Sequence, residues 1–222
     1  APMFSSGVGS PSGMFQLLYA MGDEHRMYFH GAQTAHGYPL TALRRLGYDT
    51  HLVMAWTLRE WRRMRWMASD PLWTATHVHT SEPPARLTHR LDRHQWHDSV
   101  AFDQLGALLR NATRPQFVLV WIEGMHMTHR YDKPFAPSDS NPNAQYHNSM
   151  VRVDEYMFSG DLATHTLRPL LAENKLALAI TTDHGVSPRG GDYWATNVQS
   201  LHDPNVMFAP AFMVLPRPYA LR

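Results

Sequence analysis

Apolar positions recur along this chain in two spacings, and the two spacings alternate. Short continuous apolar runs are typical of buried strands, whereas apolar residues three or four positions apart are typical of helices. The runs predict strands over residues 51–55, 116–122, 176–180 and 212–215. The wider spacing predicts helices over residues 14–21, 40–46, 57–67, 96–109 and 148–171. This alternation predicts an α/β fold with a mostly parallel central sheet and helices on both of its faces.

One of the expected helices has its apolar face at Leu40, Leu43 and Leu46. Gly47 is expected to end it, because glycine readily adopts the left-handed backbone conformation that closes helices. A strand then follows after a short gap. The succession of helix, glycine and strand is common in α/β folds and supports the predicted class.

Other segments interrupt this regular pattern. Residues 69–90 contain three prolines and little periodicity, so they are expected to form an irregular connection. The histidines of this connection are expected at the surface: His77, His79 and His89. Gly160 and Pro169 are expected to interrupt the last long helix, because both residues disfavour a continuous helical backbone.

The apolar run near residue 180 stops at Asp183, His184 and Gly185. In open α/β sheets, ligands bind beyond the carboxyl ends of the strands. A carboxylate and an imidazole side by side at such a point can share one cation such as zinc. In the alternative interpretation Asp183 caps a turn and His184 is a surface residue, and the dipeptide alone favours neither.

A second polar segment, residues 4–13, is rich in glycine and serine and is expected to be a loop that leads into a helix. The backbone N–H groups at the start of that helix would attract an anion. Ser6, Ser10 and Ser12 place three hydroxyl groups there as candidate nucleophiles. The same residues also suit an ordinary helix start in which Ser10 or Ser12 is the cap.

Polar side chains also follow the clearest predicted strand, which ends near residue 122. Acidic, basic and hydroxyl groups gather in the next few positions: Glu123, His126, His129, Arg130 and Tyr131. They come just past a strand end, as Asp183 and His184 do. The segment is therefore a second candidate contributor to a ligand site.

The composition limits the classes of function. The chain has 222 residues, enough for a single domain spanning residues 1–222 or for a large part of one. Its net charge of +1 gives no electrostatic reason to expect nucleic acid as a partner, and no apolar run is long enough to span a membrane. The absence of cysteine excludes disulfides, thiolate metal ligands and a cysteine nucleophile. Because Ala1 falls inside what looks like a motif, we expect a processed or partial domain.

Taken in order, these segments resemble the alkaline phosphatase superfamily. Within it they are most similar to the sulfatase-like branch of phosphoethanolamine transferases and lipopolysaccharide-regulating proteins. Residues 5–19 resemble the nucleophile loop and following helix of that branch, and residues 117–134 its strand with a His-containing segment. The Thr-Thr-Asp-His-Gly motif at residues 181–185 is the most specific match. The resemblance covers nearly the whole chain and implies an alkaline phosphatase-like sheet.

The resemblance also implies roles for individual residues. Three of them would bind a divalent metal, most often zinc, with calcium and manganese as alternatives: Asp183, His184 and His202. Ser10 stands where this branch has its Ser or Thr nucleophile. His126 or His129 would contact the anionic group of a small-molecule or lipid-headgroup phosphoester substrate. Relatives of this kind are typically extracytoplasmic, which implies an extracytoplasmic or periplasmic location.

Two features depart from the family pattern. The family's first strand, which ends in an acidic metal ligand, should precede the nucleophile loop, but residues 1–9 contain no Asp or Glu. The fold is therefore expected to lack this strand or to have an incomplete site. Gly9 and Gly13 also occupy the first and last places of the pattern that formylglycine sulfatases need. Ordinary sulfatase chemistry is therefore not expected.

Two functions remain open. The first, slightly favoured, is a metal-dependent hydrolase or transferase that uses Ser10 as its nucleophile. The second is a catalytically inactive sulfatase-like domain that serves as a binding or complex-assembly module, because the lipopolysaccharide-regulating relatives perform no known hydrolysis. Its candidate contact surface is the stretch rich in Trp, Arg and Met that begins at Trp56 and ends at Met67. A helix packed by its own aromatic side chains is the simpler explanation of that stretch.

Overall fold

The computed structural model describes the chain in segments that fall into two compact units. The described residues are 3–4, 10–21, 37–55, 65–78, 90–122, 148, 150–182, 208–209 and 211–217. Unit 1 comprises residues 1–46, 63–72 and 174–222, and unit 2 comprises residues 47–62 and 73–173. The prediction of a single domain stays a prediction.

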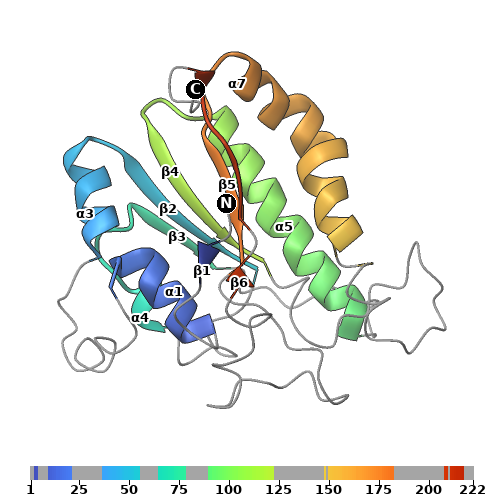
Figure 1. Ribbon diagram of the computed structural model, residues 1–222. Coiled ribbons are helices and arrows are strands. Elements are labelled where there is room, and N and C mark those ends of the chain that lie inside the picture. The colour runs from blue at the N-terminus through green and yellow to red at the C-terminus, as the bar shows by residue number, and fades with distance from the viewer. Residues whose placement is uncertain are drawn as a thin grey trace. The chain divides into compact units, whose positions relative to one another are not determined.

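Unit 2 is built on a parallel three-stranded sheet (Figure 1). Its strands are β2 (Asp49–Met54), β3 (Ala75–Val78) and β4 (Gln116–Trp121), in the order β3-β2-β4. β2 pairs with both neighbours and is buried along nearly its whole length. A strand buried on both faces has apolar residues in succession, which explains the continuous apolar run of β2 in the sequence. Both strands predicted here, over residues 51–55 and 116–122, are confirmed.

β3 contradicts the prediction that residues 69–90 form an irregular connection. It aligns Ala75 with His51 and Val78 with Met54 in a parallel pair. Among the described strands it pairs only with β2, and the side chains of Ala75, Thr76 and His77 are half-buried rather than buried. A half-buried strand does not need a continuous apolar run, and this one contains a threonine and a histidine. The apolar pattern therefore missed it.

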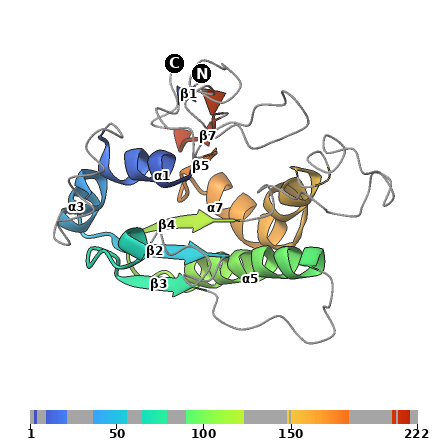
Figure 2. The same ribbon diagram turned by 90° about the horizontal axis from the view of Figure 1, so that it is seen from below.

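The helix α5 (Arg90–Arg110) covers one face of this sheet (Figure 2). Val53 of β2, Ala55 just after that strand, and Val118 and Val120 of β4 pack together on this side of the sheet. Ala101 of the helix is buried among them. The small alanine side chain lets the helix backbone approach the strands closely. The helix predicted over residues 96–109 is confirmed and begins six residues earlier than expected.

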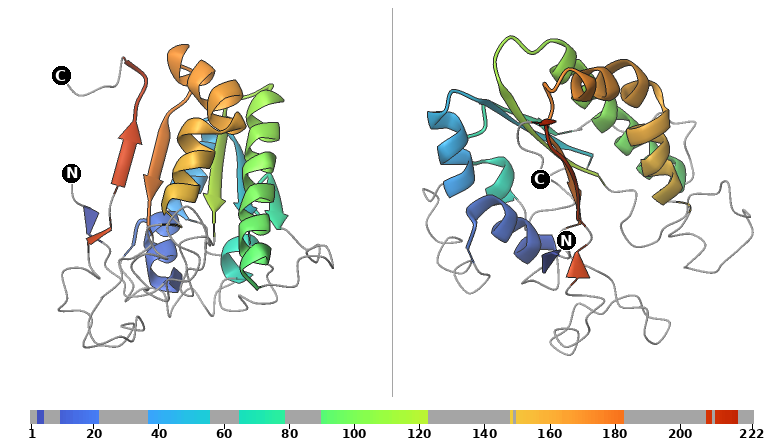
Figure 3. Two further views of the ribbon diagram at one scale, coloured as in Figure 1. Left: turned by 90° about the vertical axis from the view of Figure 1, so that its right-hand side faces the viewer. Right: turned by 45° about the horizontal axis from the view of Figure 1, so that its top comes forward.

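The chain after residue 148 is helical and runs beside α5 (Figure 3). It contains two π-helical turns, η3 (Glu155–Ser159) and η4 (Ala163–Leu167), and then α7 (Arg168–Ala172). Gly160 adopts an extended backbone conformation between the two π turns, so the predicted interruption there is confirmed. The predicted interruption at Pro169 is wrong. Pro169 lies in the first turn of α7, where its missing N–H is tolerated, and the backbone stays helical.

Two side-chain contacts join this helical segment to α5. The rings of Phe102 and Tyr156 stack with their centroids 4.8 Å apart. Nη1 of Arg110 donates a 3.0 Å hydrogen bond to Oγ1 of the buried Thr166. The helical layer on this side of the sheet is therefore fixed by both apolar and polar contacts. The stacked ring is also perturbed electrostatically: burial raises the pKa of Tyr156, and the nearby carboxylate of Asp98 raises it further.

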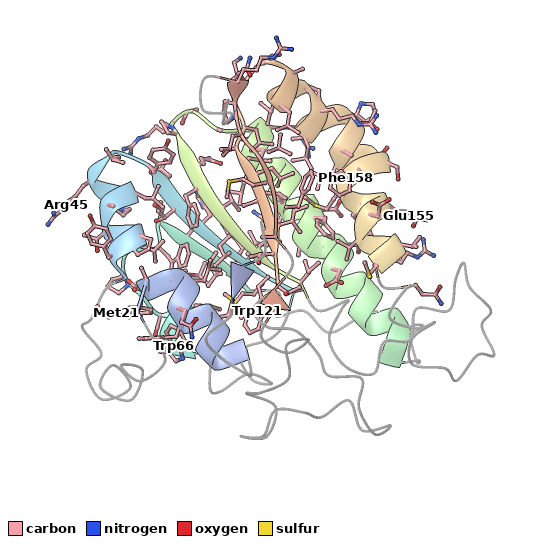
Figure 4. All side chains as sticks on the ribbon, in the orientation of Figure 1. Met21, Arg45, Trp66, Trp121, Glu155 and Phe158 are labelled. Carbon is pink, nitrogen blue, oxygen red and sulfur yellow. The ribbon has the colours of Figure 1, made fainter. Side chains whose placement is uncertain are left out.

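Unit 1 contains the helices α1 (Ser10–Tyr19), α3 (Tyr38–Arg45) and α4 (Arg65–Ala68). An aromatic cluster packs α4 against α1, because the ring of Trp66 lies 6.0 Å from that of Phe15 and 5.5 Å from that of Tyr19 (Figure 4). Burial, together with the negative charge of Asp70, raises the pKa of Tyr19 to about 12. The cluster is thus part of the core of this unit.

One expected boundary and one expected apolar position in unit 1 differ from the structure. α1 begins at Ser10 rather than at Met14, because Pro11 suits the first helical turn and the expected loop is shorter. α3 ends as predicted, with Gly47 following it at a φ of +84°. Leu40 is buried, but Leu46 lies past the last helical residue and is 73% exposed, so Leu46 is not on the apolar face.

The strands of unit 1 pair antiparallel. β5 (Leu178–Thr181) pairs with β7 (Ala211–Val214), and β1 (Met3–Phe4) pairs with β6 (Phe208–Ala209). The predicted strands over residues 176–180 and 212–215 are confirmed within two residues at each end. A first strand that ends in an acidic residue, as the family resemblance requires, is not found among the described residues. β1 precedes Ser10, but the residue after Phe4 is a serine.

Candidate functional site

The segment formed by β6 and β7 connects two distant parts of unit 1. Phe208 is the register partner of Phe4, which lies six residues before Ser10. Ala211 is the register partner of Thr181, which lies two residues before Asp183. His202 lies six residues before Phe208 in the sequence. One short stretch of backbone therefore holds together the chain segments that flank the predicted nucleophile and all three predicted metal ligands.

Ser10 is the first residue of α1, a helix of ten residues. The first backbone N–H groups of a helix have no partner within the helix, and the helix dipole gives this end a partial positive charge. Such an end favours a phosphate or sulfate group. Ser10 is therefore placed at an anion-attracting helix start, which is where a nucleophile for an anionic ester is needed. The alternative of Ser10 or Ser12 as a simple cap stays open.

The other predicted site residues lie outside the described residues: His126, His129, Asp183, His184 and His202. Within the described segments, no group of three or more His, Asp or Glu residues could hold a metal ion. The last described residue before the Asp-His pair is Thr182. Its Oγ1 is buried and has no hydrogen-bond partner in the structure. A buried hydroxyl without a partner has a cost in free energy.

A pair of histidines in unit 2 was not predicted as a functional feature. Nδ1 of His51 on β2 lies 3.4 Å from Nε2 of His77 on β3, and the two rings are nearly parallel. His77 was expected at the surface, and that expectation is wrong, because its ring packs against His51. Burial lowers the pKa of both imidazoles. The pairing depends on the register of β2 and β3, and no local pattern in the sequence reports that register.

The stretch proposed as a contact surface is packed at its described end. Met67 is fully buried and Trp66 belongs to the aromatic cluster around Tyr19. These two residues support the interpretation of a helix packed by its own side chains. The side chains of residues 56–65 lie outside the described part of the chain. In that described part, no helix combines the length and the apolar character that a membrane span requires.

The fold is that of the alkaline phosphatase superfamily. The chain is similar to the crystal structure of a protein in that superfamily from Vibrio parahaemolyticus, with a TM-score of 0.63 and 14% sequence identity. The similarity covers 96% of this chain and 50% of that chain, so this chain spans about half the length of its structural relative. Identity this low shows the fold alone. It confirms the α/β architecture predicted from the sequence.

The family follows from the sequence itself. The profile of the Sulfatase family matches residues 2–211, and the chain therefore belongs to this family. A search of curated protein sequences found no match to the chain. Proteins of this family are in general hydrolases or transferases that act on sulfate or phosphate esters, and they generally use divalent metals.

Proposed function

We propose that this chain is a metal-dependent hydrolase or transferase that acts on phosphate-type esters, with Ser10 as its nucleophile. The observation that carries the proposal is the double pairing of residues 208–214. Their partners are β1, just before Ser10, and β5, just before the Asp183-His184 pair. The backbone of unit 1 thus gathers segments that are about 170 residues apart in the sequence. These are the segments that the proposed reaction must bring together.

Ser10 would act on the phosphorus atom of a bound ester. Its oxygen loses its proton and forms a bond to phosphorus while the bond to the ester oxygen breaks, and the alcohol takes up a proton and leaves. Water or an acceptor alcohol then attacks the phosphoseryl intermediate, which breaks the bond from phosphorus to Ser10 and returns the proton to its hydroxyl. The N-terminus of α1 stabilises the negative charge of the transferring group, because its backbone N–H groups and dipole favour an anion. The helix therefore both holds the nucleophile and orients the substrate's anionic group.

The donor set fits a divalent metal. One carboxylate and two imidazoles, from Asp183, His184 and His202, are the ligand types that zinc binds, and three protein ligands leave a position open for substrate. When bound there, zinc would lower the pKa of a coordinated hydroxyl group and neutralise negative charge on the phosphoryl oxygens. Calcium or manganese are the alternatives to zinc. His126 or His129 is proposed to contact the substrate's anionic group.

The substrate class follows from the sequence around Ser10. Gly9 and Gly13 stand where formylglycine sulfatases need specific residues, so the nucleophile is proposed to be the serine hydroxyl itself. A serine hydroxyl suits phosphoryl transfer from small-molecule or lipid-headgroup phosphoesters. An extracytoplasmic location is proposed on the family resemblance alone.

The proposal is tested by measuring zinc content and turnover of an aryl phosphate and a phosphodiester. Ser10→Ala is expected to abolish turnover without loss of zinc, and His202→Ala to lose both. Ser12→Ala is the matched control, because it removes a hydroxyl two residues away in the same helical turn. Turnover that survives Ser10→Ala at the wild-type level would remove Ser10 from the mechanism.

The second candidate function, a catalytically inactive module, is favoured by the sequence before Ser10. β1 is followed by a serine where the family resemblance calls for an acidic ligand, and residues 1–9 contain no Asp or Glu. A chain that binds no zinc and turns over neither substrate would support this function. Its partner surface would then be sought in residues 56–65, because Trp66 and Met67 are packed in the core.

A further inference from the structure

The paired imidazoles of His51 and His77 belong to β2 and β3 of unit 2 and are not among the residues of the proposed reaction. In the register of this parallel pair, His51 lies opposite Ala75 and His77 opposite Val53. The two histidines are thus diagonal neighbours on the same face of the sheet, which is the face that α5 covers. Their nitrogens are 3.4 Å apart and their ring centroids 5.6 Å apart.

This contact can form only with one proton between the two nitrogens. If Nε2 of His77 donates, Nδ1 of His51 accepts, and the reverse arrangement needs the other tautomers. A second proton would place an N–H on each facing nitrogen, and neither could then accept. The hydrogen bond therefore requires that both rings are neutral or that they share one charge.

Solvent cannot meet this requirement for His51, because its side chain is buried. It is 8% exposed, and its Nε2 is buried with no hydrogen-bond partner in the structure. The protein thus leaves one nitrogen of a buried ring unsatisfied while the other contacts His77. A buried imidazolium would need partners at both nitrogens, so protonation of His51 in place is costly.

The charged groups near the pair do little to offset that cost. On β2, Asp49 favours a charged His51, but Oδ1 of Asp49 already lies 3.4 Å from Nη1 of Arg114. β4 contributes Val118 and Val120 to this face. The side chains of α5 are described from residue 98 onward, and three of them are charged. Asp98 is buried beside Tyr156, Asp103 is exposed, and Arg110 donates a hydrogen bond to Thr166. No described group therefore stands ready to neutralise a charged imidazole.

We propose that the His51–His77 pair is a proton-sensitive link between β2 and β3, which is formed at neutral pH and lost on acidification. β3 has β2 as its only partner among the described strands, so the link acts at the edge of the sheet. Acid is expected to loosen β3 from β2 before the rest of the sheet opens.

The direction of the pH dependence follows from the pKa values. Burial, the larger cause, lowers the pKa of each ring in the folded state, and the neighbouring imidazole lowers that of His77 further. The unfolded chain, with an ordinary histidine pKa of about 6.5, then binds more protons than the folded chain as the pH falls. Stability from the pair is fully present above that pH and decreases below it.

The test is native-state hydrogen exchange of the β3 amides at pH about 7.5 and about 5.5, which lie on either side of the ordinary histidine pKa. A chelator is present so that metal binding does not contribute, and the rates are corrected for the intrinsic pH dependence of exchange. The opening equilibrium of β3 is expected to rise at the lower pH by up to about tenfold for each imidazole that stays neutral in the closed state, because an opened imidazole has the ordinary pKa of about 6.5. The amides of β4 should change less.

A double-mutant cycle isolates the pair. His51→Gln, His77→Gln and the double variant are expected to show coupling at the higher pH that disappears at the lower one. His165→Gln is the matched control, because that imidazole is 72% exposed and does not touch the pair. Equal coupling at both pH values, or a wild-type pH response in His77→Gln, would overturn the proposal.

A measurement on the wild-type chain covers the case in which a variant does not fold. Ring-nitrogen NMR is expected to show the two histidines neutral at pH about 6.5, the ordinary histidine pKa, with one facing nitrogen protonated and the other not. Two independent titrations at the ordinary histidine value would overturn the proposal. Neither measurement depends on the proposed Ser10 chemistry, so the two proposals can fail separately.

Discussion

Gly37 lies directly against the carbonyl oxygen of Leu18, so no side chain fits between the start of α3 and α1. A Cβ atom added to Gly37 would overlap that oxygen. The backbone at Gly37 has a φ of −60° and a ψ of 132°, which any residue can adopt. The need for glycine here is therefore steric, and the close approach of the two helices depends on it.

Gly37→Ala is expected to destabilise the chain by about 1–3 kcal/mol or more, because the helices must move apart to admit the methyl group. The matched control is Gly47→Ala, in which the new Cβ meets nothing within 4 Å but φ is +84°. That change should cost about 1–2 kcal/mol through backbone strain alone. Urea unfolding of both variants measures the difference. A smaller loss for Gly37→Ala than for Gly47→Ala would contradict the steric explanation.

Leu52 in the middle of β2 is fully buried. Leu52→Ala removes buried apolar surface and leaves a cavity, so a loss of about 2–5 kcal/mol in unfolding free energy is expected. Leu46→Ala makes the same chemical change at a residue that is 73% exposed, and it should change stability by no more than about 0.5 kcal/mol. Thermal and urea unfolding of the two variants provide the comparison. Similar losses would show that β2 is not at the centre of its unit.

Tyr19 should make unit 1 sensitive to alkali. Its folded-state pKa is raised from 10.0 to about 12, chiefly by burial and secondarily by Asp70. A group whose pKa is raised by folding stabilises the fold fully below its unfolded pKa of 10.0, and this contribution is lost as the pH rises toward about 12. Unfolding followed between those pH values should show decreasing stability. Tyr19→Phe keeps the ring and should flatten this dependence, and an unchanged slope would exclude Tyr19 as its origin.

How much of the fold the sequence reveals depends on how each element is buried. β2 and β4 are recognisable because strands within a parallel sheet are apolar on successive residues. β3 contains Thr76 and His77 and lies at the edge among the described strands, so its pattern is too polar to be recognised. The prediction at Pro169 was wrong for a different reason. A proline inside an α-helix predicts a break, but Pro169 lies in the first turn of α7, where a proline is tolerated.

The candidate site shows the same division between chemistry and geometry. The residue types of Asp183, His184 and Ser10 can be interpreted from the sequence, because ligands and nucleophiles are recognisable wherever they stand. The proposal that they lie together rests on the pairing of Phe4 with Phe208 and of Thr181 with Ala211, which joins segments that are distant in the sequence. The contact between His51 and His77 likewise depends on a strand register. Register is set by packing of the whole sheet, so local sequence does not reveal it.

Removal of bound metal is expected to loosen the strands of unit 1 more than those of unit 2. The proposed ligands Asp183 and His184 follow β5, and His202 precedes β6. A ligand that binds only the folded state at a hundred times its Kd stabilises that state by about 2.7 kcal/mol. A chelator should therefore speed hydrogen exchange in β5 and β7, and added zinc should reverse the change. β2 should respond less, because the proposed ligands are not attached to it.

His184→Ala provides the control for this experiment, because a variant that cannot hold the metal should exchange quickly with or without the chelator. The aromatic cluster around Trp66 gives an internal reference within unit 1, since it contains none of the proposed ligands. Equal changes in β2 and β5 would mean that the metal stabilises both units together. A chelator that changes neither strand in zinc-loaded protein would place the metal away from β5, and Asp183 and His184 would no longer be its ligands.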